Sequence, residues 1–137
     1  MKYLLLIGRC LYSLIFIVSG FNHFNRETIA YASQNNVPAP DILVPLSGLL
    51  IIIGGMSITL GLKAKIGSLL IILFLIPVTL YMHHFWNINR PEEHTLQLVM
   101  FMKNLSMLGS AFIILYFGSG PLSLDSFSEY RSSPKIK

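Results

Sequence analysis

The side chains that could do chemistry gather near one level of this sequence. All four histidines fall close to the ends of long apolar stretches, beside an amide, two polar aromatic residues and a carboxylate. They are His23, His83, His84 and His94, with Asn22, Tyr81, Trp86 and Glu93 nearby. Imidazoles near a carboxylate can bind a metal ion, relay protons or hydrogen-bond a quinone carbonyl. These residue types are candidates for a binding site, to be weighed against a purely interfacial role.

A second reactive pair, Lys103 and Asn104, interrupts the apolar run "LVMFMKNLSMLGS" at 98–110. A charge at the centre of a bilayer costs about 3 kcal/mol on insertion scales. Lys103 lies only roughly 10 Å inside its stretch at 1.5 Å per residue. Because helical side chains lean toward the N-terminus of their helix, Lys103 and Arg9 can each extend to the nearer head groups. The alternative is that Lys103 and Asn104 line a polar pocket in the outer half of the protein.

Four apolar stretches must position these groups. Of the 137 residues, 53% are hydrophobic and 12% are charged, about half the charged share of a soluble domain. The stretches 3–21 and 96–117 carry one charge each, and 42–62 and 66–82 carry none. A membrane-spanning helix needs roughly 17–25 mostly apolar residues. The sequence predicts an all-α polytopic membrane protein, a four-helix bundle with spans at about 3–23, 42–62, 66–84 and 96–117.

The histidine cluster has three interpretations, which the sequence leaves open. Histidine, tyrosine and tryptophan commonly occupy the head-group zone, where they form an interfacial belt without a site. Alternatively, they line a pocket for a quinone or another small molecule, with Lys103 slightly below them. A metal or haem site is the least favoured, because no HxxxH or CxxC pattern occurs. The pocket candidates are Lys103, Asn104, His84, His83, His23, Trp86 and Arg9.

The basic residues outside the spans predict the orientation. Six lie at the start of the chain, in the connection at 61–65 and in the tail: Lys2, Lys63, Lys65, Arg131, Lys135 and Lys137. The other two connections hold only Arg26 and Arg90. The positive-inside rule therefore predicts cytoplasmic termini. The net charge of +4 then suits anionic lipid, and no nucleic-acid partner is expected.

Small residues and the connections predict the remaining organisation. Glycine and serine at helical spacing allow close helix packing in lipid, and the candidates are Gly54, Gly55, Gly61, Ser106 and Ser110. Residues 25–41 form a connection in which 28–34 is expected to be a short interfacial helix. The membrane domain is predicted at 1–120, followed by a mobile, Ser-rich cytoplasmic tail at 121–137. Cys10, the single cysteine, is expected to be an apolar filler.

Three segments resemble the DoxX family: "GRCLYSLIFIVSGFNHF" at 8–24, the region 45–86 ending in "YMHHFW", and "FMKNLSMLGSAFIIL" at 101–115. The matching positions are Arg9, Ser19, Gly20, Gly54, Gly55, His84, Phe85, Lys103, Asn104 and Gly109. The resemblance implies a compact four-helix membrane bundle. This sequence departs from the family pattern at one place. An acidic residue is expected shortly before the Gly-Gly pair, but "LLIII" precedes the pair here.

The resemblance also carries the functional expectations. Family members are associated with a terminal quinol oxidase and with thiosulfate:quinone oxidoreduction, which implies a membrane subunit of a redox-linked complex handling quinone, thiol or sulfur compounds. In that case Lys103 and Asn104 would be donors to the ligand and His84 its proton partner, with electrons from a redox partner protein. The alternative is a non-catalytic carrier, lipid-binding protein or assembly anchor, with homo-oligomers as a further expectation. Neither alternative decides whether the chain is an enzyme.

Overall fold

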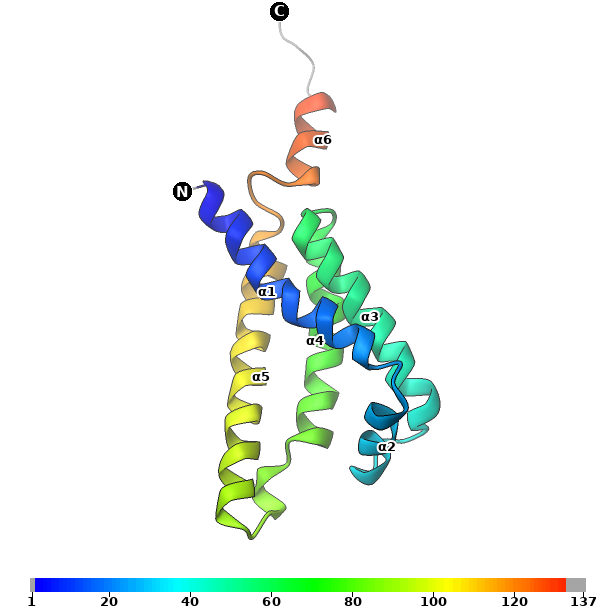
Figure 1. Ribbon diagram of the computed structural model, residues 1–137. Coiled ribbons are helices and arrows are strands. Elements are labelled where there is room, and N and C mark those ends of the chain that lie inside the picture. The colour runs from blue at the N-terminus through cyan, green and yellow to red at the C-terminus, as the bar shows by residue number, and fades with distance from the viewer. Residues whose placement is uncertain (1, 133–137) are drawn as a thin grey trace, which may run out of the picture.

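The computed structural model describes residues 2–132, and these form a bundle of four long helices with two short ones (Figure 1). The long helices are α1 (Lys2–Asn22), α3 (Pro40–Leu60), α4 (Ala64–Met82) and α5 (Pro91–Phe117). The short ones are α2 (Arg26–Gln34) and α6 (Leu124–Ser132), and a 3₁₀ turn, η1 (Phe85–Asn87), follows α4. All four long helices are long and apolar enough to cross a membrane. The predicted fold class, an all-helical protein with four helices of spanning length, is confirmed.

The helices pack in chain order, with α1 on α3, α3 on α4, and α4 on α5. The two central helices are the most buried, and α5 is the least. Side chains from all four helices form the core: Phe16, Ile51, Ile58, Ile71, Ile72, Leu75 and Ala111. Ser68, fully buried on α4, donates a 2.5 Å hydrogen bond to the carbonyl of Ala111 on α5. Most other large apolar side chains face outward, as lipid contact requires.

Glycines, which have no side chain, let the backbones of α1 and α3 approach closely where these two helices cross. A Cβ on Gly20 would lie 2.9 Å from the carbonyl oxygen of Gly48, and one on Gly48 would lie 2.8 Å from that of Gly20. Gly54 makes a similar approach to Gly67 on α4, and Gly55 lies against Ile17 on α1. Such contacts replace the hydrophobic effect, which does not act between helices in lipid.

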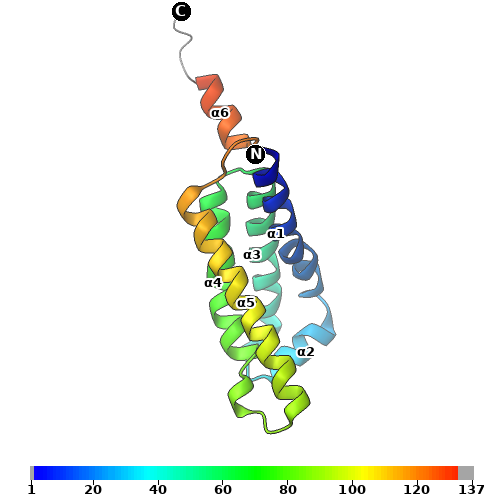
Figure 2. The ribbon, with the colours of Figure 1, turned by 90° about the vertical axis from the view of Figure 1, so that its left-hand side faces the viewer.

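The two ends of the bundle differ. We call the end that holds the start of α1, the α3–α4 turn and α6 the tail end, and the opposite end, which holds all four histidines, the histidine end. About halfway along α1 the Tyr12 hydroxyl donates to the carbonyl of Met107 on α5 over 3.0 Å. Toward the histidine end α1 and α5 separate, with α1 running to α2 and α5 to η1 (Figures 1 and 2).

A group of polar contacts, here called the tail clasp, ties the chain after α5 to the tail end. It comprises Arg9, Gly61, Ser119, Leu122 and Asp125. The guanidinium of Arg9 donates to the carbonyls of Ser119 and Leu122, over 2.6 Å in the second case. The carboxylate of Asp125 accepts from the backbone N–H of Lys63 at the start of α4, and its own N–H donates to the carbonyl of Gly61.

The tail clasp bears on two predictions. Within the segment expected to be a mobile tail, the structure describes helix α6; mobility itself stays a prediction, and residues 133–137 lie outside the described residues. Arg9 extends toward the tail end as expected, but its partners are carbonyl groups of its own chain. The chain therefore satisfies this cation internally.

Candidate functional site

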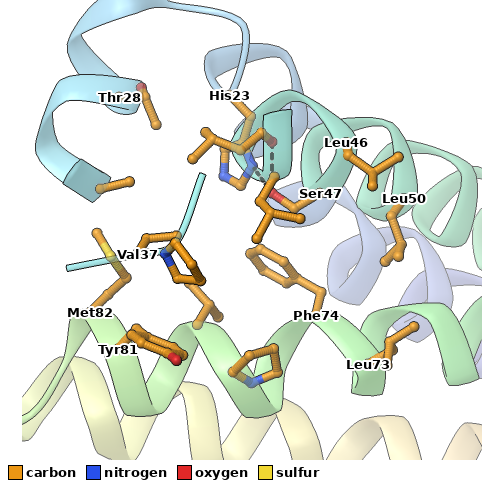
Figure 3. Close-up of a pocket in the computed structure, with 16 residues that line it drawn as sticks. His23, Thr28, Val37, Leu46, Ser47, Leu50, Leu73, Phe74, Tyr81 and Met82 are labelled. Atoms are coloured by element: carbon orange, nitrogen blue, oxygen red, sulfur yellow. Dashed lines mark hydrogen bonds between the residues drawn. The ribbon is translucent and has the colours of Figure 1, made fainter. Parts of the chain in front are cut away.

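An apolar pocket of about 290 Å³ lies at the histidine end, between the end of α1, α2, α3 and α4 (Figure 3). Four of its lining residues have polar side chains: His23, Thr28, Ser47 and Tyr81. The others are apolar: Ala32, Val37, Pro38, Leu43, Val44, Leu46, Leu50, Leu73, Phe74, Pro77, Val78 and Met82. Ligand sites commonly have such walls, in which a few polar groups fix the orientation of a mostly apolar guest.

A chain of hydrogen bonds orients His23. Its Nδ1 lies 2.9 Å from the hydroxyl oxygen of Ser47, and that hydroxyl donates to the carbonyl of Val44 over 2.7 Å (Figure 3). Because a serine hydroxyl has one hydrogen, which goes to Val44, Ser47 accepts from His23. The neutral imidazole then carries its proton on Nδ1, and Nε2 keeps a lone pair. The pocket thus gains a hydrogen-bond acceptor with a fixed orientation.

The wall from α4 adds further polar atoms. Pro77 lies inside this helix and has no N–H, so the carbonyl of Leu73, four residues earlier, lacks its usual helical donor. Tyr81, one turn beyond Pro77, supplies a phenol. Phe74 stacks obliquely on the His23 ring at 5.6 Å between centroids. The pocket therefore combines aromatic surface with an acceptor from α1 and a hydroxyl from α4.

A polar hollow of about 280 Å³ lies beside the apolar pocket. The end of α2, the end of α4 and the first turns of α5 line it with Tyr31, Gln34, Asn35, Met82, His84, Ile88, Glu93 and Gln97. Met82 lines both cavities. The Nδ1 of His84 lies 2.9 Å from the carbonyl oxygen of Tyr81. Since a carbonyl can only accept, the Nε2 of neutral His84 is also a hydrogen-bond acceptor.

The remaining groups of the histidine end hold α4, η1 and α5 together. His83 Nδ1 lies 2.8 Å from the Gln97 side-chain oxygen, which joins α4 to α5. Edge-to-face contacts link the rings of Phe85, Trp86, His94 and Phe101, with centroids 5.3–6.1 Å apart. Trp86 therefore packs in an aromatic group beside the polar hollow and does not line either cavity. Within residues 2–132, no three His, Cys, Asp or Glu residues are grouped closely enough to hold a metal ion.

The placement of Lys103 and Asn104 corrects the pocket predicted from their sequence. The Lys103 side chain is exposed, and its Nζ reaches back toward the histidine end, 3.4 Å from the Met100 sulfur. Asn104 is buried and donates to the Thr79 hydroxyl on α4 over 3.1 Å. Neither residue lines the apolar pocket or the polar hollow. Adjacent helix positions point about 100° apart, so one faces lipid and the other α4.

The other predicted positions divide in the same way. His23 lines the apolar pocket and His84 lines the polar hollow, so the expected single cluster is two. Arg9 belongs to the tail clasp at the opposite end of the bundle. Ser106 is exposed, and Ser110 donates back to the carbonyl of Ser106 over 3.2 Å. These two serines therefore do not join α5 to another helix of the bundle, unlike Gly54 and Gly55.

Comparison with known proteins shows which family this chain resembles. Residues 4–84 match the family described as DoxX. The chain belongs to the DoxX family. It is 27% identical over 124 residues to the inner membrane protein YphA of Escherichia coli (strain K12), which covers 89% of this chain and 88% of YphA. No solved structure matches this DoxX protein.

The DoxX match covers the apolar pocket and stops before α5. Every residue that lines the pocket lies within 4–84, whereas Lys103 and Asn104 lie outside it. Ser47, Pro77 and Tyr81 were not among the pocket candidates predicted from sequence. Two sequence signals could have found Pro77 and Ser47. Pro77 is a proline within an apolar span, which leaves a carbonyl without its N–H donor, and Ser47 lies in the span that follows the one ended by His23.

Proposed function

We propose that this DoxX protein is the ligand-binding membrane subunit of a redox-linked complex, and that its apolar pocket holds a quinone-type ring. The observation that supports this most is the His23–Ser47–Val44 chain in an otherwise apolar wall. It presents one oriented acceptor to a lipid-soluble guest. The chain binds and orients the ring, while the electrons come from a partner protein.

The chemistry of a quinone ring fits both polar sides of the pocket. One hydroxyl of the reduced ring can donate to the Nε2 lone pair of His23. The oxygen on the opposite side of the ring, a hydroxyl in the reduced form and a carbonyl in the oxidised form, can accept from the phenol of Tyr81. Phe74 and the aliphatic side chains supply apolar contact for the ring and its tail. In a site without bulk water such hydrogen bonds are stronger than in water.

The predominance of hydrocarbon in the wall favours a second function, that of a non-catalytic carrier. Twelve of the sixteen lining residues have apolar side chains. A fatty acyl chain would be buried there without using the His23 acceptor. Competition between a quinol and a fatty acid of similar length separates the two functions, because removal of the His23 acceptor weakens binding of the quinol only.

We also propose that the protein lies in the inner membrane with both termini in the cytoplasm. The name of YphA supports the first part. The excess of Lys and Arg at the tail end supports the second, by the positive-inside rule. The apolar pocket then opens in the outer leaflet, and the polar hollow lies at its head groups.

Anaerobic equilibrium dialysis of a short-chain benzoquinol, which carries the hydroxyl donors, against the purified protein in detergent tests the proposed ligand. His23→Phe keeps a ring but removes the acceptor, and we expect it to weaken binding about tenfold, the loss of one buried hydrogen bond. Leu50→Trp, which fills the pocket, should abolish saturable binding. Lys103→Met is the matched control and should bind as the wild type does. Equal affinity in all four proteins, or a loss in Lys103→Met alone, would contradict the proposal.

A further inference from the structure

We propose that the polar hollow binds a primary ammonium group, presented either by a lipid head group or by a free amine. This proposal does not rest on the proposed quinone site, although Met82 lines both cavities. The argument rests on the hydrogen-bonding atoms that remain in the hollow, on its one charged side chain and on the helix ends that surround it.

Three of the lining residues, His84, Asn35 and Glu93, each use one side-chain atom in an internal contact and keep an acceptor on another. His84 uses Nδ1 on the carbonyl of Tyr81 and keeps Nε2. Asn35 uses its amide nitrogen on the carbonyl of Tyr31, over 2.9 Å, and keeps its side-chain oxygen. Glu93 engages Oε2 with Arg90 and keeps Oε1. A primary ammonium has three N–H donors and no acceptor, which matches this set.

The charge of the hollow has the sign that an ammonium requires. Glu93 is the only charged side chain that lines it. Arg90 pairs with Glu93 at 2.6 Å but is 84% exposed, so water and salt weaken this ion pair. Glu92 and His94, the neighbours of Glu93, do not line the hollow. An ammonium that enters therefore meets one carboxylate and competes only with an exposed arginine.

Two helix ends add to the same electrostatic preference. The last residue of α2, Gln34, the capping residue that follows it, Asn35, and the last residue of α4, Met82, all line the hollow. The C-terminal end of a helix carries a partial negative charge and favours cations. The opposing N-terminal end of α5 carries Glu93 in its first turn, which offsets the partial positive charge of that end.

The test compares head groups that differ only in their N–H donors. Native mass spectrometry of the detergent-purified protein would count bound phosphatidylethanolamine against phosphatidylcholine with the same acyl chains. Quenching or enhancement of Trp86 fluorescence would measure dodecylamine against dodecyltrimethylammonium, since Trp86 is the single tryptophan and its ring lies 6.4 Å from that of His84. We expect the primary ammonium compound to be preferred about tenfold in at least one pair.

Substitutions around one carboxylate give opposite expected signs. Glu93→Gln removes the charge and should reduce the preference for the primary ammonium about fivefold. Arg90→Gln removes the competing cation and should strengthen binding about twofold. Glu92→Gln, at an exposed neighbouring position, is the matched control. It should change neither the preference for the primary ammonium nor the strength of its binding.

Every outcome has a defined meaning. Preference for phosphatidylethanolamine alone identifies a lipid head group as the source, and preference for dodecylamine as well identifies a free amine as sufficient. Equal binding of primary and quaternary ammonium compounds by the wild type overturns the proposal without reference to any variant. Equal effects of Glu93→Gln and Glu92→Gln would overturn it too. Quinol binding is measured separately, so either site can fail while the other is retained.

Discussion

Among single residues, Arg9 has the most demanding environment. Its side chain is 5% exposed and holds two carbonyls of the tail clasp, yet its Nε has no hydrogen-bond partner in the described structure. A buried cation without a paired carboxylate is stable only if enough oxygen atoms surround it. Here the carbonyls of Ser119 and Leu122 supply them, with Asp125 adding an attractive charge nearby.

Arg9→Met should therefore destabilise the protein by about 2–3 kcal/mol, because two carbonyls lose charge-assisted donors. Arg9→Lys should lie between the wild type and Arg9→Met, since one ammonium cannot reproduce the two-armed geometry. Thermal unfolding in detergent, followed by circular dichroism, measures both. Lys2→Met, on the exposed start of α1, is the control; a loss equal to that of Arg9→Met would indicate a general charge effect.

Asp125 gives the tail clasp a defined pH dependence. The Ser119 hydroxyl and the backbone N–H groups of Lys63 and Ala64 donate to this carboxylate and hold its pKa below the usual range. A lowered pKa in the folded state means that the stabilisation is complete above the ordinary Asp pKa, about 3.9, and is lost as the pH falls through the lower folded value.

Hydrogen exchange measures this directly. After correction for intrinsic rates, amides of α6 should lose protection as the pH falls below about 4. Asp125→Asn should show reduced protection at neutral pH and no further loss on acidification. A wild-type protein whose α6 protection is independent of pH down to 2 would contradict the assignment.

Residue chemistry could be predicted from sequence only in part. The direction in which Arg9 and Lys103 extend follows from helix geometry, and both side chains extend as expected. Whether a residue faces lipid or a neighbouring helix depends on the rotation of its helix. In α5, where apolar residues occur on every face, that rotation has no clear signal, so Lys103 and Asn104 were placed together although they face different surroundings.

At the level of helices, the Gly20–Gly48 contact determines how α1 crosses α3. Gly48→Ala should destabilise the bundle by about 1–3 kcal/mol, because the added Cβ would lie 2.7 Å from the Cβ of His23 and 2.8 Å from the Gly20 carbonyl oxygen. Gly109→Ala is the matched control in α5: nothing lies within 4 Å of its added Cβ. It should be neutral or stabilise by up to about 1 kcal/mol through helix propensity.

Thermal unfolding of both variants checks this prediction, and quinol dialysis of Gly48→Ala extends it. His23 lies beside Gly48 and lines the apolar pocket, so a shift of α1 should also weaken ligand binding in this pocket. Similar melting temperatures for Gly48→Ala and Gly109→Ala would show that the close approach is not needed.

The presence of each helix could be predicted from the sequence, but which helix ends lie side by side could not. Length and apolar composition identify a membrane-spanning helix locally, so four spans and even the short α2 follow from the sequence. Which helix ends meet depends on crossings between residues far apart in the chain. The division of the expected cluster between two cavities follows from such crossings.

For the whole molecule, the proposed orientation can be tested by cysteine labelling. Cys10 is the single native cysteine, so Cys10→Ser gives a background for one new cysteine at Asn89 and, separately, one at Lys63. We expect a membrane-impermeant maleimide added to intact spheroplasts to label Asn89→Cys and to label Lys63→Cys only after lysis. The reverse pattern would place the histidine end in the cytoplasm.

The thioether of Met82 has a consequence for the molecule as a whole, because it forms part of the wall of both cavities. Methionine is unbranched and turns easily to suit a guest. A guest that turns it reshapes the neighbouring chamber, so the two occupancies are thermodynamically linked. Reciprocity then requires each guest to alter the dissociation constant of the other by the same factor. A lipid at the rim would thereby tune the affinity for a ring held deeper in the bilayer.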